Sequence, residues 1–260
     1  MAPVLRRAKP PREPRELAVG RYARLDRGRP QRIGVPEVIL GEGKSVDHLL
    51  GIVRALAARR QGALISRPTR AQLRALRVAR DTGVPLRFLA DGRLVRLSGA
   101  LGVAYRAGTV AVLTAGTSDV PVAEEACALL RELGVEVVTA YDVGVAGLHR
   151  LTRAARRLER SRPEMYLAFA GREGALPTVL AGLVRAPVVG VPTSVGYGRG
   201  GRGEAALTAM LQSCAPLAVV NIDAAVPAAL FAAQRFATRP PSVGRAMKSR
   251  GRTARRRTAE

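Results

Sequence analysis

Five short apolar segments recur in the second half of the chain, and they constrain its fold more than any other feature of the sequence. Each is a continuous run rich in Val, Leu and Ala, which is typical of strands buried on both faces of a parallel sheet. The segments between them have the apolar spacing of helices. The predicted strands are residues 109–116, 135–140, 165–171, 186–193 and 217–223, and the predicted helices are 119–133, 145–160, 174–185, 202–212 and 224–237. We therefore expect an α/β fold over residues 108–238, with a C-terminal doubly wound, flavodoxin-like parallel sheet of about five strands.

Residues 31–98 have a different, mixed pattern. The predicted elements are strands at 38–40 and 63–66 and helices at 46–60 and 67–83. Thr69 is the expected N-cap of the second helix, and Gly83 is its expected stop. The residues that follow alternate around Asp91-Gly92, which predicts a β-hairpin with a two-residue turn. This pattern predicts a small α+β domain that precedes the larger one.

The positive charge of the chain is concentrated at its two ends. The formal net charge is +23, and residues 1–30 contain nine basic and three acidic residues, while residues 239–260 contain eight and one. Both segments are rich in Arg and have no sustained apolar period, so they are predicted to be a flexible basic arm and a disordered basic tail. A basic chain attracts polyanions, but aromatic residues make up only 3% of this one and no nucleic-acid-binding motif interleaves with the basic runs. These observations disfavour a dedicated nucleic-acid partner.

Hydropathy and cysteine content exclude several other classes of protein. No apolar run approaches the roughly 20 residues needed to span a bilayer, and the N-terminus lacks the apolar core of a secretory signal. The chain is therefore predicted to be cytoplasmic, without a membrane partner. Two cysteines, Cys127 and Cys214, are too few for a disulfide framework. No Asp, Glu or His cluster has metal-site spacing, so no metal ligands are predicted.

Small and polar residues follow the first predicted strand of the larger domain. Gly116 would let the backbone approach a ligand closely. Thr117, Ser118 and the N–H groups at the start of the next helix could hold a phosphate or a carboxylate. Asp119 begins that helix, and an ordinary helix cap explains the same residues equally well. Ligands of doubly wound sheets bind beyond the carboxyl ends of the strands, where this turn lies.

The next two strand ends contain further polar candidates. Asp142 and His149 follow the second strand, although a lone histidine within a helical pattern is more often structural. Glu173 follows the third strand and is flanked by glycines, with Gly174 on its C-terminal side. This position places a carboxylate at the mouth of the expected site.

A long Gly-rich segment, residues 191–203, follows the fourth strand and includes Ser194 and Gly196. Such a segment could wrap a nucleotide or form a flexible surface loop. Long loops in doubly wound domains are commonly functional, so Ser194 and Gly196 are candidate substrate contacts.

The two cysteines differ in context. Cys127 lies in an amphipathic helical pattern and is predicted to pack in the core. Cys214 lies in a loop between a helix and a strand, where its thiol can be accessible. Nearby arginines would favour the thiolate, the reactive form. Spacing alone leaves the function of Cys214 open.

Taken together, six motifs resemble the LarB family, the pyridinium-3,5-biscarboxylic acid mononucleotide synthases of nickel-pincer cofactor biosynthesis. The motifs are RIGVPEVILGEGKS, TAGTSDVPVAEEA, DVGVAGLHR, GREGALPTVLAGL, PVVGVPTSVGYG and SCAPLAVVNID. The resemblance covers residues 24–237. The second half is also similar to the aminoimidazole ribonucleotide carboxylase (PurE) domain, which shares the turn after the first strand and the Val-Pro pair of the fourth.

The LarB resemblance implies a reaction on a small nucleotide, nicotinic acid adenine dinucleotide. CO₂ or bicarbonate is the co-substrate that adds a second carboxylate to the pyridinium ring, and cleavage of the phosphoanhydride releases AMP. The resemblance implies no tightly bound cofactor, and it leaves room for magnesium (Mg²⁺) acting through the substrate phosphates. It also implies a homo-oligomer, an octamer in PurE-like proteins.

The same resemblance assigns roles to individual residues. Cys214 matches the family's nucleophile, and Glu173 is the candidate for handling the ring proton or positioning CO₂. Ser118 and Asp119 match the turn that contacts the ligand. The neighbouring Gly116 and Thr117 would help to hold its carboxylate or phosphate, and His149 is a weaker candidate.

The predicted topology separates Cys214 from the other candidates. A helix-to-strand loop lies at the amino ends of the strands, and a strand of five residues spans roughly 17 Å. We therefore expect a neighbouring subunit to bring the cysteine to the site. The main alternative is a purine enzyme of the aminoimidazole ribonucleotide carboxylase type. Its substrate is already an electron-rich enamine and needs no covalent activation, so Cys214 and the additional N-terminal domain argue against it.

Overall fold

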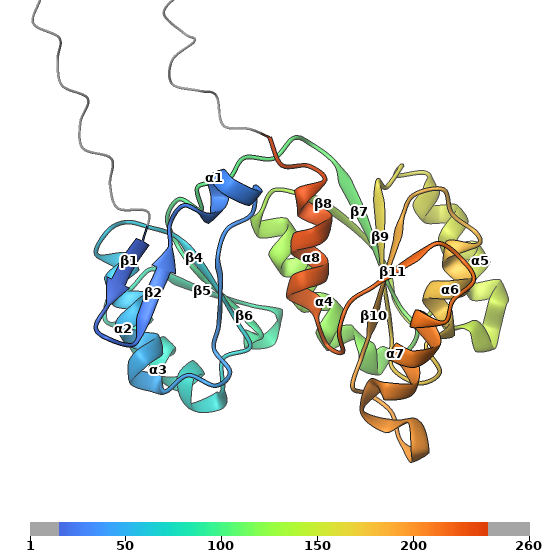
Figure 1. The fold of residues 1–260 in the computed structure, drawn as a ribbon, viewed down its shortest axis with the longest axis horizontal. Coiled ribbons are helices and arrows are strands. Elements are labelled where there is room, and N and C mark those ends of the chain that lie inside the picture. Colours follow the sequence, from blue (N-terminus) through green and yellow to red (C-terminus); the bar gives the residue numbers. More distant parts are fainter. Residues whose placement is uncertain (1–15, 239–260) are drawn as a thin grey trace, which may run out of the picture.

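The computed structural model describes residues 16–238, which form two domains side by side (Figure 1). The C-terminal domain contains a five-stranded sheet in the order β11-β10-β9-β7-β8. All of its pairs are parallel. The strands are β7 (Thr109–Thr114), β8 (Glu136–Ala140), β9 (Met165–Ala170), β10 (Val188–Pro192) and β11 (Leu217–Val219). This order confirms the predicted flavodoxin-like, doubly wound fold, whose strand order reverses between β7 and β9.

Helices cover both faces of this sheet (Figure 1). Helices α4 (Val120–Glu132) and α8 (Ala225–Gln234) pack on the face toward the N-terminal domain. Helices α5 (Leu148–Glu159), α6 (Ala175–Ala181) and α7 (Glu204–Leu211) pack on the other face. Successive residues of β7 alternate between the two core clusters, which explains why the sequence of this strand is apolar throughout. Three short 3₁₀ turns, η2 (Thr117–Asp119), η3 (Val145–Gly147) and η4 (Gly198–Gly203), follow β7, β8 and β10.

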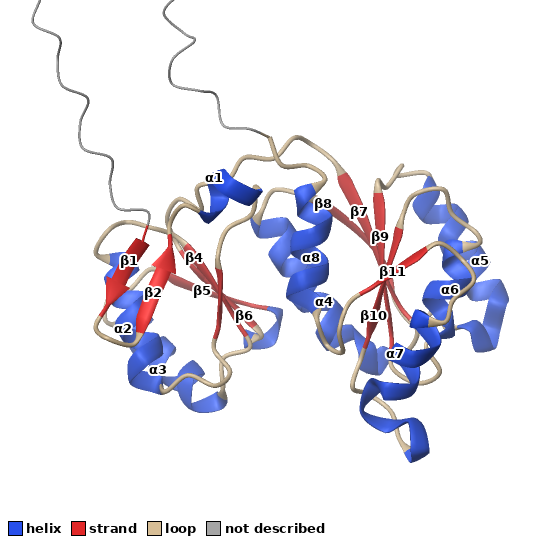
Figure 2. Ribbon diagram, viewed as in Figure 1, coloured by secondary structure: helices blue, strands red, loops and turns tan. Residues whose placement is uncertain are grey.

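The N-terminal domain is α+β, as predicted (Figure 2). Its sheet has the order β3-β4-β6-β5, in which only β3 and β4 are parallel. The elements are β3 (Val38–Leu40), α2 (Val46–Ala57), β4 (Ala63–Ser66), α3 (Arg70–Asp81), β5 (Leu86–Leu89), the 3₁₀ turn η1 (Ala90–Gly92) and β6 (Leu94–Leu97). Thr69 is the N-cap of α3, as predicted. Its side chain accepts a hydrogen bond from the Gln72 N–H, and the Gln72 side chain accepts one from the Thr69 N–H.

The hairpin at Asp91-Gly92 forms, but its loop is longer than predicted. Leu89 pairs with Leu94, which leaves residues 90–93 in the loop instead of two residues. Ala90 also adopts a positive φ of 47°, and Asp91 and Gly92 have values of 51° and 86°. The residues with positive φ therefore begin at Ala90, one position before the Asp91-Gly92 pair that predicted the turn.

The predicted flexible arm is wrong for the part that the structure describes. Residues 16–33 form the antiparallel pair β1 (Glu16–Val19) and β2 (Ala23–Asp26), followed by α1 (Arg29–Ile33). Leu17, Val19 and Leu25 are buried in the core cluster of the N-terminal domain. These apolar residues alternate with polar ones over only one short hairpin. Because many arginines surround them, the alternation does not stand out in the sequence. Residues 1–15 and the predicted tail at 239–260 lie outside the described residues.

The two domains share a continuous interface. Leu64 and Leu94 of the N-terminal domain belong to the same buried cluster as α4 and α8. Across the interface, Glu132 of α4 pairs with Arg87 at 2.8 Å and with Arg96 at 3.3 Å. None of the helices between residues 16 and 238 combines the length and apolar character needed to cross a bilayer.

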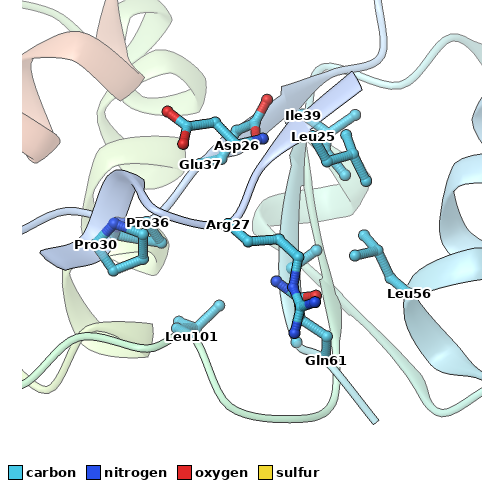
Figure 3. A pocket seen from close by; sticks show the side chains of 12 residues that line it. Leu25, Asp26, Arg27, Pro30, Pro36, Glu37, Ile39, Leu56, Gln61 and Leu101 are labelled. Atoms are coloured by element: carbon cyan, nitrogen blue, oxygen red, sulfur yellow. The ribbon is translucent and has the colours of Figure 1, made fainter. Parts of the chain in front are cut away.

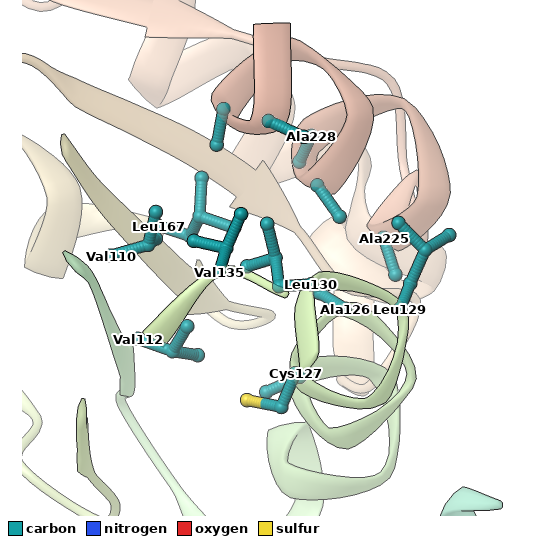
Figure 4. Packing of buried hydrophobic residues seen from close by; sticks show 14 of the residues in the cluster. Val110, Val112, Ala126, Cys127, Leu129, Leu130, Val135, Leu167, Ala225 and Ala228 are labelled. Carbon is teal, nitrogen blue, oxygen red and sulfur yellow. The ribbon is translucent and has the colours of Figure 1, made fainter. Parts of the chain in front are cut away.

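Cys127 packs between α4 and the sheet, as predicted (Figure 4). Its side chain is fully buried, and this burial raises the pKa of the Cys127 thiol to about 11. The thiol is therefore protonated at neutral pH, which agrees with a packing role.

The contact between α4 and α8 depends on small side chains. The buried face of α8 is made of alanines, namely Ala225, Ala228, Ala229, Ala232 and Ala233. We expect Ala229→Leu to destabilise the protein by about 1–3 kcal/mol, because added methylenes force a close-packed interface apart. Urea unfolding measures this loss. Phe231→Leu changes a side chain of the same helix that is 51% exposed, and it should shift the free energy of unfolding by less than about 0.5 kcal/mol. Equal effects of the two substitutions would contradict the packing described here.

Candidate active site at the carboxyl edge of the sheet

The parallel sheet brings almost all of the predicted site residues to one edge. Its strands run in the same direction, so the segments after β7, β8, β9 and β10 meet at the carboxyl ends. These segments contain Gly116, Thr117, Ser118, Asp119, Asp142, Glu173, Gly174, Ser194 and Gly196. We call this end of the sheet the carboxyl edge. Thr117, Ser118, Glu173 and Ser194 are exposed there.

Asp119 is the buried centre of the carboxyl edge. Its residue is only 3% exposed, and one carboxyl oxygen accepts a hydrogen bond from the Gly116 N–H at 2.8 Å. The other accepts one from the Thr193 hydroxyl at 2.6 Å. Burial raises the pKa of Asp119, these two hydrogen bonds oppose the rise, and the carboxylates of Asp223 and Glu173 add to it. Three carboxyl groups from three strand ends therefore interact at this edge.

Close packing of the backbone joins the segments after β9 and β10. A Cβ atom at Gly171 would lie 2.2 Å from the Val195 carbonyl oxygen. Gly174 has a φ of 67°, and a Cβ there would lie 2.6 Å from the Ala206 carbonyl oxygen. Glycine is required at both positions. The structure thus gives Gly174, a predicted substrate contact, a role in packing next to Glu173.

Asp142 and His149 are exposed, whereas Asp119 is buried. The Asp142 carboxylate accepts a hydrogen bond from Arg150 at 3.1 Å, and its backbone N–H donates to the Thr114 hydroxyl at 3.1 Å. This second bond anchors the turn after β8 to the end of β7. His149 is exposed near the start of α5.

Three residues of the carboxyl edge were missed by the sequence reasoning. The Thr193 hydroxyl donates a hydrogen bond to the Asp119 carboxyl group. Asp223 accepts a hydrogen bond from the Ser194 N–H at 2.9 Å, and Arg67 of the N-terminal domain lies 3.9 Å from its carboxylate. Asp223 was assigned to the last strand, but β11 ends at Val219, so Asp223 belongs to a fifth turn. The signal for Thr193 and Asp223 was their position at strand ends, whereas nothing in the sequence pointed to Arg67.

Cys214 does not reach this edge within one chain. It is exposed and precedes β11, whose first residue, Leu217, pairs with Val188, the first residue of β10. Cys214 therefore lies at the amino ends of the strands. The five residues of β10 separate it from Thr193 by roughly 17 Å.

One cavity of the N-terminal domain is too small for a nucleotide. This cavity, beside Gln61 and Leu101, holds only about 40 Å³ (Figure 3). Ligand pockets usually span about 300–1,000 Å³. Within residues 16–238 no group of three His, Cys, Asp or Glu side chains could hold a metal ion.

Comparisons with known proteins match both domains. The sequence profile of the AIR carboxylase family matches residues 109–257, and that of the LarB/PurE-like N-terminal domain matches residues 17–97. An uncharacterised protein of Methanocaldococcus jannaschii is 39% identical over 212 residues, which is 80% of this chain and 82% of that protein. The N5-carboxyaminoimidazole ribonucleotide mutase of the same organism is 29% identical and covers 52% of this chain and 83% of its own length.

Two further matches cover about half of the chain. The N5-carboxyaminoimidazole ribonucleotide mutase of Pyrococcus abyssi is 32% identical, over 54% of this chain and 79% of its own length. The crystal structure of Treponema denticola PurE is 24% identical, over 48% of this chain and 80% of that one, with a TM-score of 0.40.

The parallel fold, the carboxyl edge and the profile match together define a protein of the carboxylase class. The chain belongs to the AIR carboxylase family and, within it, to the LarB-like proteins, in which a LarB/PurE-like N-terminal domain precedes a PurE-like domain.

The raised pKa of Asp119 predicts a pH-dependent stability. Between the ordinary value of 3.8 and the raised pKa, the folded protein binds more protons than the unfolded chain, so stability falls as the pH rises through this window. Asp119→Asn mimics the protonated carboxyl group, and the Thr193 hydroxyl can turn to accept from its amide. The free energy of unfolding of this variant, relative to wild type, should therefore increase from pH 4 toward neutral pH in urea titrations.

Asp81→Asn is the matched control, because it removes a carboxylate that is 63% exposed. A difference between Asp119→Asn and wild type that does not change with pH would contradict the proton binding inferred for Asp119.

Proposed function

We propose that this protein carboxylates the pyridinium ring of nicotinic acid adenine dinucleotide with CO₂ or bicarbonate and hydrolyses its phosphoanhydride. The products are pyridinium-3,5-biscarboxylic acid mononucleotide and AMP. The observation that supports this proposal best is the combination of a LarB/PurE-like N-terminal domain and an AIR carboxylase domain in one chain. The two mutases cover 52% and 54% of the chain.

Carboxylation of a pyridinium ring requires prior activation. The ring is electron-poor and does not attack CO₂. A thiolate that adds to the carbon para to the ring nitrogen converts the ring to a dihydropyridine, whose adjacent carbon is nucleophilic and attacks CO₂. Loss of the proton from that carbon and expulsion of the thiolate restore the aromatic ring, with no net oxidation. Cys214 would supply this thiolate, since it is exposed and the other cysteine is buried.

The carboxyl edge would bind the pyridine nucleotide. Glu173 is exposed there and would accept the ring proton or position CO₂. The hydroxyl groups of Thr117 and Ser118 would hold the carboxylate or phosphate of the substrate. The raised pKa of Asp119 favours its neutral form and so reduces the repulsion between this edge and an anionic substrate.

A second copy of the chain would complete the site. Cys214 and Glu173 lie at opposite ends of the strands, so one chain cannot place both on one ring. We infer a homo-oligomer in which the Cys214 loop of one subunit faces the carboxyl edge of another.

The reaction is tested by incubating the protein with nicotinic acid adenine dinucleotide and bicarbonate. We expect AMP and a product whose mass has increased by one carboxylate relative to nicotinic acid mononucleotide. Cys214→Ala should lower the rate of carboxylation by more than about a thousandfold, because the ring is then never activated. Cys127→Ala is the matched control and should keep the wild-type rate, since Cys127 only fills the core. Carboxylation by Cys214→Ala at the normal rate would show that the mechanism is not covalent, and no product from wild type would refute the proposed reaction.

The shared site is tested by mixing two inactive variants. Cys214→Ala and Glu173→Gln each remove one half of the site. In random mixed oligomers, about a quarter of the sites combine an intact Cys214 with an intact Glu173. Such oligomers should therefore recover about a quarter of the wild-type activity. Mass spectrometry of the intact assemblies verifies the mixing. Mixed oligomers without activity would place both residues in one chain's site and contradict the shared arrangement.

The mutase matches favour a second candidate, a purine-pathway enzyme acting on a carboxylated aminoimidazole ribonucleotide. This substrate is an enamine and needs no thiolate. Turnover of aminoimidazole ribonucleotide or its N5-carboxy form by both wild type and Cys214→Ala would favour this candidate.

A further inference from the structure

A second cavity lies between the two domains next to the carboxyl edge. Its volume is about 420 Å³, within the usual range of ligand pockets, which is about 300–1,000 Å³. The polar side chains that line it are Glu42, Arg67, Thr69, Asp91 and Arg93 of the N-terminal domain and Asp223 of the C-terminal domain. We call it the interdomain cavity.

Asp223 connects the interdomain cavity to the carboxyl edge. Its carboxylate accepts the Ser194 N–H at the start of the Gly-rich segment, and its charge contributes to the raised pKa of Asp119. Asp223 therefore borders both the carboxyl edge and the interdomain cavity.

Two guanidinium groups of the cavity are suited to a phosphate. Arg67 lies 3.6 Å from the Glu42 carboxylate and 3.9 Å from the Asp223 carboxylate, and it donates a hydrogen bond of 3.4 Å to the Asp223 carbonyl oxygen. A guanidinium group has five N–H donors, so Arg67 keeps donors for a ligand. Arg93 faces the Glu125 carboxylate with its buried Nε atom, at 3.5 Å, and its terminal N–H groups are left for a ligand. Planar guanidinium groups bind phosphate oxygens in pairs. The exposed carboxylates of Glu42 and Asp91 are suited to the hydroxyl groups of a ribose.

The need for such a cavity follows from the size of the substrate. The compound in the mutases' name is a single ribonucleotide, and those proteins cover about half of this chain. The substrate proposed above contains two nucleotide halves. The domain that the LarB/PurE-like N-terminal profile matches supplies five of the six polar lining residues.

We propose that the interdomain cavity binds the adenylate half of the dinucleotide, with its phosphate on Arg67 and Arg93 and its ribose toward Glu42 and Asp91. This assignment rests on the proposed function for the identity of the substrate. The N-terminal domain is then the part of the protein that selects a dinucleotide over a mononucleotide.

The assignment is tested by calorimetric titration of the full chain with AMP and, separately, with nicotinic acid mononucleotide. Arg67→Gln should weaken AMP binding by about tenfold, the effect of losing one charged hydrogen-bond donor. Arg93→Gln alone would leave the buried Glu125 carboxylate without its cation, so it is combined with Glu125→Gln. This double variant should also weaken AMP binding about tenfold, while its affinity for nicotinic acid mononucleotide changes less than about twofold.

Arg74→Gln is the matched control, because it removes one exposed positive charge from α3 outside the cavity. It should leave AMP binding unchanged. An equal loss in Arg74→Gln and Arg67→Gln would reduce the effect to general electrostatics and overturn the assignment, and so would AMP binding that neither Arg67→Gln nor the double variant alters. If wild type does not turn over the dinucleotide but AMP binding still depends on Arg67 and Arg93, the proposed function fails and the adenylate site stands.

Discussion

The hydrogen bonds of one buried carboxyl group determine how the carboxyl edge is arranged. The carboxyl group of Asp119, in the turn after β7, accepts hydrogen bonds from the Gly116 N–H of the same turn and from the Thr193 hydroxyl after β10. Strand β9 lies between β7 and β10. The side chain therefore spans the end of a strand and fixes two turns relative to each other. A buried carboxyl group without these partners would be strongly destabilising, so its position and those of the two turns depend on one another. The exposed candidates Thr117, Ser118 and Glu173 lie around this arrangement.

A similar arrangement joins the two domains. Glu125 of α4 is completely buried, accepts a hydrogen bond from Ser66 at 2.5 Å and lies 3.5 Å from Arg93. Burial raises the pKa of Glu125, while Ser66 and Arg93 oppose the rise. A buried carboxyl group is tolerated only when it has such partners, and here both come from the facing domain, which gives the interface a defined register. That register places Arg67 beside Asp223 and so brings the N-terminal domain into contact with the carboxyl edge.

Most of the fold could be predicted because the signals are local. The apolar runs of the sheet, the capping residues Thr69 and Gln72, and the hairpin at Asp91 each depend on neighbours within a few residues. The prediction failed at residues 16–30, where the apolar alternation of Leu17, Val19 and Leu25 is short and surrounded by arginines. A hairpin of this size is stable only when it packs on a domain, and that contact is absent from the local sequence.

The sequence by itself determined the sheet, the order of its elements and the strand ends at which polar residues collect, because strand periodicity and parallel topology fix these features. It also distinguished the core residue Cys127 from Cys214, which lies in a loop. Only the tertiary structure decided that Asp119 is buried against Thr193, that Asp223 belongs to the carboxyl edge, and that Arg67 reaches it from the other domain. These contacts join residues that are 74 and 156 positions apart, and no local pattern encodes such a distance.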